Sequence, residues 1–243
     1  MNDIIRHVNN YTDNYNPYFT YPQWYNYLSN NSVYGQMSSC YCKKSFFRIL
    51  NTYADNLDIQ VNEIIMAENL KKGEFTKYVK FDPGRYQVKI YESEPKKIVF
   101  ESTVDIDRNL AYTGVIAEDD YDKTDMSILM IPEAKENSNT SRMSAVRFIN
   151  LAAEAPDLEL AASDGAVLFS GVNYGDVSGN VFIPSGRYTL KLREKQSKSD
   201  VKTMNIEFAP RMHYTLFVSG KYGENPDVKI IIPEDGVNYL ELC

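Results

Sequence analysis

Apolar and polar residues alternate in short runs along most of the chain after residue 45. The alternation is clearest at residues 86–91 and 188–193, and each of these runs follows a turn signal built of proline and glycine. Alternation with β-branched and aromatic residues predicts strands with one buried and one solvated face. Further strands are expected at 98–106, 111–117, 127–131, 200–208, 214–219 and 228–232.

A helical pattern is not sustained anywhere in this part of the chain. Residues 62–70 come nearest to one, but the corresponding segment later in the chain contains Ser163-Asp164-Gly165, which predicts a turn. We therefore expect strands and turns without a helix after residue 45.

The chain repeats itself once, and this is its most informative feature. Three pairs of segments match at offsets of 99 to 102 residues: 46–51 with 145–150, 83–90 with 185–192, and 131–133 with 232–234. The last pair reads Ile-Pro-Glu in both copies. Offsets that drift so little indicate a duplication with small loop insertions, and the period is too long for a solenoid.

The repeat and the strand spacing together predict the fold. About seven short strands in each copy, separated by turns, are typical of an antiparallel sandwich. We expect an all-β protein of two tandem antiparallel β-sandwich domains, immunoglobulin-like or transthyretin-like, related by duplication and preceded by an irregular arm. The expected division is arm 1–44, first sandwich 45–133, polar linker 134–144, second sandwich 145–234 and C-terminal tail 235–243.

Residues 1–44 differ in composition from the rest. They hold eight of the 19 tyrosines, eight asparagines and the only tryptophan, whereas aliphatic residues are sparse. Such a segment cannot bury much aliphatic surface alone, yet its aromatic rings favour a partner over water. We expect an arm that docks on another surface and can pair with a sheet edge of a neighbouring subunit. Its expected contact residues are Tyr18, Tyr21, Trp24, Tyr25 and Tyr27.

The three cysteines, Cys40, Cys42 and Cys243, lie outside the predicted sandwiches. An odd number of cysteines in a chain without a recognisable signal peptide does not indicate a disulfide framework. Incidental reduced thiols are the favoured interpretation, and cross-linking between chains is the second. Metal binding is the third, because a zinc site needs about four ligands and only His7 and His213 can add imidazoles.

Charge and hydropathy exclude several classes of function. Lys and Arg total 26 against 33 Asp and Glu, a net charge of −7. This balance argues against nucleic acid as a partner, because phosphates need a basic surface. No apolar run approaches the roughly 18 residues of a membrane helix. Residues 1–14 lack the features of a signal peptide, so we expect a chain made in the cytoplasm.

Motifs for catalysis are not apparent. The window closest to a nucleophile elbow surrounds Ser178, but it has Asp176 and Asn180 where glycines are needed. His213 is expected to be a strand residue on an outer or half-buried face rather than a catalytic base. Phosphate-binding loops and the βαβ units that hold them are missing. We therefore expect no enzymatic activity and no cofactor.

Carboxylates cluster twice. Residues 105–109 begin like a calcium-binding loop, but leucine and isoleucine stand where glycine and glutamate are required. The denser acidic loop 118–125 is expected to be a solvated hairpin tip, since like charges repel and stay hydrated. A cation site in this loop is the alternative, and we expect no metal elsewhere.

Two residue types recur at equivalent positions of both copies: Arg48 and Asn51, and Arg147 and Asn150. Retention in both copies favours a structural role over a ligand site. The expected role is bonding to turn carbonyls, or pairing of the arginines with Asp58 and Asp157.

The second copy carries the motifs of a known family: Arg147-x-x-Asn150, then residues 154–159, Pro184-Ser185-Gly186-Arg187-Tyr188 and Tyr214. These resemble the bacterial family called domain of unknown function 4397, whose members typically show histidine where Asn51 and Asn150 stand. The resemblance covers about 190 of the 243 residues and leaves the arm uncovered. It implies a β-sandwich, often in an envelope or surface setting and often in tandem. It implies no chemistry, so no catalytic residue is carried over.

These features predict a non-catalytic structural or assembly protein of a bacterial cell or spore envelope. It would bind protein partners or itself through the aromatic arm, and its tyrosines and cysteines can be cross-linked. The Tyr-rich, Asn-rich, cysteine-tipped composition is similar to that of endospore coat components, so the spore coat is its expected place. The alternative is a carbohydrate- or peptidoglycan-binding module for cell-wall glycan, in which exposed aromatics such as Trp24, Tyr25 and Tyr27 stack on sugar rings. If the sandwiches themselves bind, aromatics should line one outer face of a sandwich.

Overall fold

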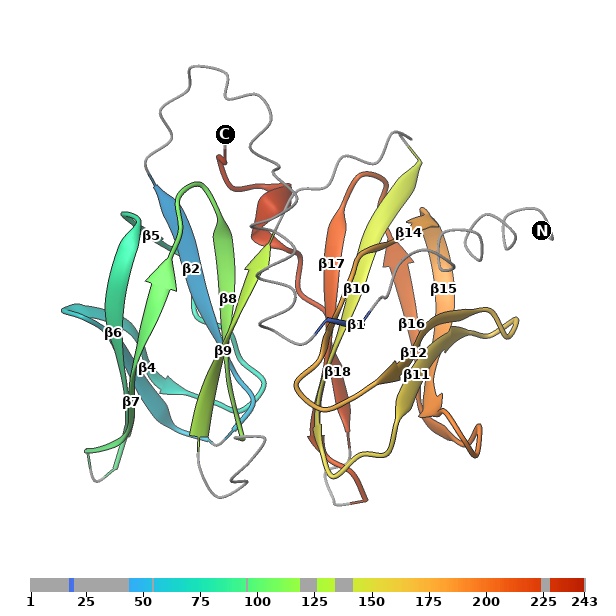
Figure 1. Cartoon of the computed structure of the whole chain (residues 1–243), viewed down its shortest axis with the longest axis horizontal. Helices are drawn as coiled ribbons and strands as arrows, with labels where there is room; N and C mark the ends of the chain where they lie inside the picture. The colour runs from blue at the N-terminus through green and yellow to red at the C-terminus, as the bar shows by residue number, and fades with distance from the viewer. Residues whose placement is uncertain are drawn as a thin grey trace. The chain divides into compact units, whose positions relative to one another are not determined.

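A computed structural model describes residues 18–19, 44–53, 55–94, 96–118, 126–133, 142–223 and 228–242. The chain forms two compact units, and each contains a β-sandwich of two sheets (Figure 1). One unit, here called the first sandwich, combines Ser32–Lys135 with Gly236–Cys243. The other, the second sandwich, combines Met1–Asn31 with Glu136–Asp235. The predicted all-β class with two sandwiches is confirmed.

The first sandwich is built from a sheet of strand order β5-β2-β8-β9 and a sheet of order β4-β3-β6-β7. The strands are β2 (Ser45–Asn51), β3 (Leu57–Val61), β4 (Ile64–Leu70), β5 (Val79–Phe81), β6 (Gly84–Glu92), β7 (Lys97–Ile106), β8 (Ala111–Glu118) and β9 (Met126–Glu133).

The second sandwich repeats this arrangement. One sheet has the order β1-β13-β10-β17-β18, with β14 also paired to β10, and the other has the order β12-β11-β15-β16. The strands are β1 (Tyr18–Phe19), β10 (Met143–Ala153), β11 (Leu158–Ala162), β12 (Val167–Val172), β13 (Val177–Ser178), β14 (Val181–Pro184), β15 (Gly186–Glu194), β16 (Asp200–Phe208), β17 (His213–Lys221) and β18 (Lys229–Ile231).

The alternating runs form half-buried strands, as predicted. In β6, Val88 and Ile90 are fully buried, whereas Gln87 and Lys89 between and beside them keep contact with solvent. Residues 188–193 form the matching part of β15. The other predicted strands coincide with β7, β8, β9, β16, β17 and β18.

One pair of strands in each sandwich is parallel, which differs from the purely antiparallel pairing that we expected. β2 pairs in parallel with β8, and β10 pairs in parallel with β17. The chain between these strands crosses through the opposite sheet, and such a long crossover lets two strands run in the same direction. These central strands are also buried on both faces, as parallel strands generally are.

Residues 62–70, the nearest approach to a helix in the sequence, form a hairpin arm instead. Val61 pairs with Ile64, and Asn62 adopts a φ of 48° in the two-residue turn between β3 and β4. Asparagine tolerates this left-handed conformation better than most residues. Within the described residues the only helical element is the short 3-10 helix η1 (Gly236–Asn238).

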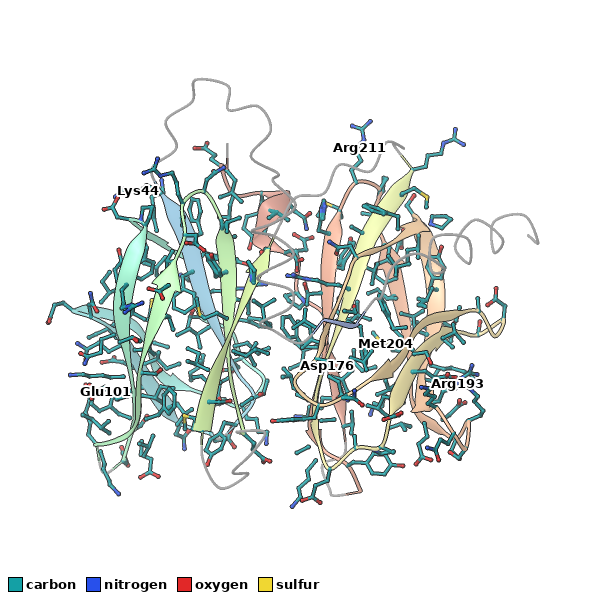
Figure 2. The ribbon with its side chains drawn as sticks, viewed as in Figure 1. Lys44, Glu101, Asp176, Arg193, Met204 and Arg211 are labelled. Atoms are coloured by element: carbon teal, nitrogen blue, oxygen red, sulfur yellow. The ribbon has the colours of Figure 1, made fainter. Side chains whose placement is uncertain are left out.

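Side chains fill the space between the sheets of the second sandwich (Figure 2). Phe148 of β10 stacks on Phe169 of β12 with ring centroids 5.8 Å apart, so the two sheets meet through aromatic rings. Met204 packs against the same core, whereas Arg193 on the other side of its sheet bonds to Glu159 (Figure 2).

Candidate functional site

A short strand of the N-terminal arm extends one sheet of the second sandwich. β1 pairs antiparallel with β13, so that Tyr18 lies opposite Ser178 and Phe19 opposite Val177. Val177 in turn pairs with Ile149 of β10, which makes β1 the outermost strand of this sheet (Figure 1). The arm therefore binds by strand addition, in which backbone groups provide the contact.

The edge that receives β1 is held in place by its own sandwich. Ser178 Oγ accepts a hydrogen bond from the Phe148 backbone N–H (2.7 Å) and donates one to the Gly179 carbonyl (3.0 Å). Asp176, labelled in Figure 2, accepts hydrogen bonds from the backbone and side chain of Asn173 (3.2 and 3.1 Å). Because these bonds do not involve the arm, the β13 edge is formed independently of it.

Only a small part of the predicted arm site can be placed. The structure describes the backbone of Tyr18, within β1. The other predicted contact and cross-linking residues lie outside the described residues: Tyr21, Trp24, Tyr25, Tyr27, Cys40, Cys42 and Cys243. The same holds for residues 119–125 of the acidic loop. Val177 and Ser178, which receive the arm, were not predicted, and no sequence signal marks a two-residue edge.

In the first sandwich a buried arginine, threonine and carboxylate form a hydrogen-bonded cluster. Arg48 Nε donates to Thr113 Oγ1 (2.9 Å), and the Thr113 hydroxyl donates to Glu133 Oε1 (2.7 Å). Arg48 Nη2 lies 3.4 Å from the same carboxylate oxygen. Arg48 is 5% exposed and Glu133 is 1% exposed, so solvent does not screen the pair. Each charge compensates the desolvation of the other.

Two aromatic rings cover the guanidinium of this cluster. The centroids of Phe75 and Tyr78 lie 4.6 and 4.5 Å from Arg48 Cζ. The Tyr78 hydroxyl also donates to Glu133 Oε1 (2.5 Å). Burial, and after it the Glu133 carboxylate, raise the pKa of Tyr78 far above its usual range. Tyr78 therefore stays protonated and acts as a hydrogen-bond donor.

The second sandwich repeats the cluster with an aspartate. Arg147 Nε donates to Thr215 Oγ1 (2.7 Å), and the Thr215 hydroxyl donates to Asp235 Oδ2 (2.9 Å). Arg147 Nη2 lies 3.6 Å from Asp235 Oδ2. The arginine and the threonine thus recur at equivalent positions of the two copies.

The carboxylate of the second cluster is not the residue that the repeated Ile-Pro-Glu motif aligns with Glu133. That residue is Glu234, one position before Asp235. In the first sandwich Pro132 pairs with Tyr112, whereas in the second Glu234 pairs with the equivalent Tyr214. Strand pairing, and not the motif, decides which side chain faces the arginine.

The predicted acidic partners of the two arginines were therefore wrong. Asp58 lies in β3, in the sheet opposite β2, where it accepts hydrogen bonds from the Asn69 backbone N–H (2.9 Å) and the Ser93 hydroxyl (2.6 Å). Asp157 lies 3.8 Å from Lys195 Nζ. Both aspartates bond to their own sheet or its loops, and neither reaches the buried arginines.

Asn51 and Asn150 bond to backbone groups, as the structural hypothesis expected. In each copy the side-chain NH₂ donates to a carbonyl of the opposite sheet, and the side-chain oxygen accepts a backbone N–H two residues further on. The bonds are 2.9–3.0 Å long, with the carbonyls of Leu70 and Val172 as acceptors and the amides of Tyr53 and Ala152 as donors. The asparagines thus join the two sheets of each sandwich.

Replacing Asn150 with alanine is expected to lower the free energy of unfolding of the second sandwich by about 2–4 kcal/mol. The reason is that the Val172 carbonyl and the Ala152 N–H both lose their partner in a buried place. Urea denaturation measures the loss, with Asn205→Ala at an exposed hydrogen bond as the control without effect. An unchanged midpoint for Asn150→Ala would contradict the structural role.

Charged pairs occupy the outer faces of the sheets that contain β6 and β15. Arg85 pairs with Asp105 (2.9 Å), and Arg187 pairs with Glu207 (3.0 Å). Among the described residues the exposed large apolar side chains are Ile64, Ile65, Ile98, Val167 and Tyr239. Only one of them is aromatic.

Other candidate chemistry is sparse in the described part of the chain. His213 opens β17 and is buried, and its carbonyl accepts the Asp235 N–H (3.3 Å). No group of three or more His, Cys, Asp or Glu side chains that could hold a metal is found among the described residues. Within the same residues, no helix has the length and apolar character needed to cross a membrane.

Comparisons with known proteins return distant structural likenesses. No curated protein matches the chain. A family 26 carbohydrate-binding module from Eubacterium rectale Amy13K, solved with maltoheptaose, aligns with a TM-score of 0.26 and 9% identity, over 77% of this chain and 95% of that one. The Bacillus anthracis TIE protein aligns with a TM-score of 0.25 and 10% identity, over 74% of this chain and 34% of that one.

A third likeness is to family 41 carbohydrate-binding modules from streptococcal virulence factors, with a TM-score of 0.25 and 10% identity over 76% of this chain and 96% of that one. Likenesses at this level carry no argument about function. The comparison of sequence families is more specific. The model described as "Domain of unknown function (DUF4397)" matches residues 45–161 and 144–238, and leaves the arm unmatched. The chain therefore belongs to the DUF4397 family and contains two tandem DUF4397 domains.

Proposed function

We propose that this protein is a non-catalytic structural protein of a bacterial cell or spore envelope that assembles through its N-terminal arm. The observation that carries the proposal is the pairing of β1 with the β13 edge of the second sandwich. A sheet edge offers backbone donors and acceptors to any extended segment, whichever chain supplies it. A second copy carries the same arm and the same edge, so the contact within one chain can also form between chains.

The protein concentration decides whether β1 pairs with the β13 edge of its own chain or with that of another chain. Only two residues of β1 pair with β13, and each hydrogen bond contributes about 0.5–1.5 kcal/mol net. The strand is therefore easily exchanged. β1 and the β13 edge belong to one chain, and this covalent connection corresponds to an effective concentration of order 1 mM. Pairing between chains is favoured once the concentration of chains exceeds this effective concentration, as it does in a densely packed structural layer.

Composition supports the same function. Tyrosine provides a large amphipathic contact surface at low entropic cost, and the arm holds eight of the 19 tyrosines. We expect cross-links after assembly to form through Cys40, Cys42 and Cys243. A Tyr- and Asn-rich protein with such thiols suits the spore coat.

The proposal of a non-catalytic role rests on how the buried ionisable groups are used. Arg48 and Glu133 bond to each other and to Thr113, and Arg147 bonds to Thr215 in the same way. Groups engaged in this manner join neighbouring strands of one sheet. A catalytic acid or base would instead face a cavity that admits substrate.

Disrupting β1 is expected to abolish self-association. In the full chain with Tyr18→Pro and Phe19→Pro, two backbone donors disappear and the pairing with β13 fails. Light scattering coupled to size-exclusion chromatography should show wild-type oligomers at a protein concentration of about 1 mM and a monomer in dilute solution. The variant should remain a monomer at both concentrations.

A matched control chain carries Tyr11→Pro and Thr12→Pro instead, two changes in the arm but outside β1. This control should assemble like the wild type. Equal assembly by all three chains would contradict the proposal. Repeating the measurement with reductant, and on a chain that starts at Ser45, separates the contribution of the cysteines from that of the arm.

A further inference from the structure

The last residues of the chain belong to the first sandwich and not to the second. The Gly236 backbone N–H donates to Glu133 Oε2 (2.5 Å) and to the Tyr78 hydroxyl (3.1 Å). Val237 follows in η1 and is 3% exposed, and the Tyr239 ring packs edge-on against Tyr78 with centroids 6.2 Å apart. A short terminal segment is thus bound by residues 103 and 158 positions earlier in the chain.

The site that binds this segment, here called the tail seat, consists of residues of the first repeat: Arg48, Phe75, Tyr78, Thr113 and Glu133. Three of them donate to one oxygen of the Glu133 carboxylate, namely Oε1. The second oxygen, Oε2, receives the N–H of the terminal segment. Arg48, Thr113 and Glu133 are therefore joined by hydrogen bonds that do not involve the terminal segment.

The tail seat is specific to the first sandwich. Thr76 of the first sandwich and Ser178 of the second accept the equivalent backbone N–H of β2 and β10. Counting from these two residues, Tyr78 corresponds to Asn180. Asparagine has no ring to cover an arginine or to pack against a peptide. The DUF4397 fold therefore forms without a tail seat, and the first sandwich carries it in addition.

The limited space around Gly236 restricts which peptide sequences can bind in the tail seat. A Cβ at this position would lie 2.8 Å from Tyr78 Cζ and 2.5 Å from Leu240 Cδ1. The Tyr78 ring cannot withdraw easily, because it stacks on Arg48 and bonds to Glu133. The tail seat thus requires glycine followed by a residue that can be buried, and residues 236–240 read Gly-Val-Asn-Tyr-Leu.

We propose that the tail seat is a docking site between chains, which in the assembled protein binds residues 236–242 of a second copy. When its own segment leaves, Glu133 Oε2 exchanges the Gly236 N–H for water and Val237 loses its buried position, which is unfavourable until another such segment binds. The same segment of a neighbouring chain restores every contact, and exchange of an identical element is a low-cost route to oligomers. The inference rests on the proposed function and adds a second contact that does not use the arm.

Two full-length chains test this docking site, and both carry the Tyr18→Pro and Phe19→Pro changes so that β1 does not contribute. The acceptor chain has Gly236→Ala, which displaces its own terminal segment and leaves the tail seat intact. The donor chain has Tyr78→Ala, which impairs its tail seat and leaves the segment intact. Mixed in equal amounts, they should form about tenfold more dimer than either chain alone, as measured by light scattering.

A second measurement avoids the change at Tyr78. A labelled peptide of residues 234–242 is titrated into the acceptor chain and followed by fluorescence anisotropy, with the Gly→Ala peptide as the matched control. The glycine peptide should bind about tenfold more tightly. Equal binding of the two peptides, or no heterodimer from chains that circular dichroism shows to be folded, would overturn the inference. Either result leaves arm-driven assembly intact, because the arm is disabled throughout.

Discussion

Replacing Arg48 with methionine is expected to lower the free energy of unfolding of the first sandwich by about 3–5 kcal/mol. The substitution leaves the Glu133 carboxylate buried without its counter-charge, and it removes the guanidinium on which Phe75 and Tyr78 stack. A buried ion is stabilised in protein mainly by its partner, so removing one member costs more than the pair contributes net.

Urea denaturation measures this loss, and the exposed pair of Arg85 and Asp105 provides the control. Arg85→Met should leave the midpoint unchanged, since solvent screens that pair. Adding Glu133→Leu to Arg48→Met should recover part of the stability, because the unpaired charge is then gone. Equal effects of Arg48→Met and Arg85→Met would show that the cluster does not stabilise the sandwich.

The second large effect is expected in the core of the second sandwich. Phe148→Ala should lower the free energy of unfolding by about 3–5 kcal/mol. Phe148 is 0% exposed and stacks on Phe169 of the opposite sheet, so its removal leaves a cavity where the two sheets meet.

Chemical denaturation together with hydrogen exchange checks this prediction. The amides of β10 and β17 should exchange faster in Phe148→Ala, because these strands form the centre of the affected sheet. Ile65→Ala in β4 is the control without effect, since this side chain is 64% exposed. A loss below about 1 kcal/mol for Phe148→Ala would mean that the core closes over the missing ring.

The strands could be predicted because their signal is local. Alternation at 86–91 and 188–193 reflects which side chains two positions apart share a face, and the structure buries Val88 and Ile90 accordingly. The duplication was equally visible, since each copy repeats the same local pattern. Both observations together were enough for the sandwich class, whereas the family followed from the resemblance of motifs such as Pro184-Ser185-Gly186-Arg187-Tyr188.

The partners of the buried arginines could not be predicted, because that information is not local. Arg48 reaches Glu133 across 85 positions of sequence, and nearer carboxylates such as Asp58 lie in the other sheet. In the second copy a shift of one residue in strand pairing brings Asp235 to the arginine instead of Glu234. A one-residue shift turns a side chain to the opposite face of the sheet, and a match between sequence motifs does not reveal such a shift.

The sites that bind the two end segments of the chain could not be predicted from the sequence either. The arm was predicted to dock, but the pairing of Phe19 with Val177 uses backbone groups, which every residue has. Residues 235–243 were predicted to be a tail outside the sandwiches. In the structure, Gly236 bonds to Glu133 and Tyr78 of the first sandwich. Its role as a close-fitting glycine becomes visible only when the Tyr78 ring is in place.

The sequence by itself determined the class of fold, the duplication, the positions of most strands and the family, because these depend on neighbouring residues and on repeated patterns. The tertiary structure alone decided the parallel pairs, the arginine clusters, the β13 edge and the tail seat. Each of these depends on which distant strands lie side by side and in which register, and that is settled when the two sheets of each sandwich pack together.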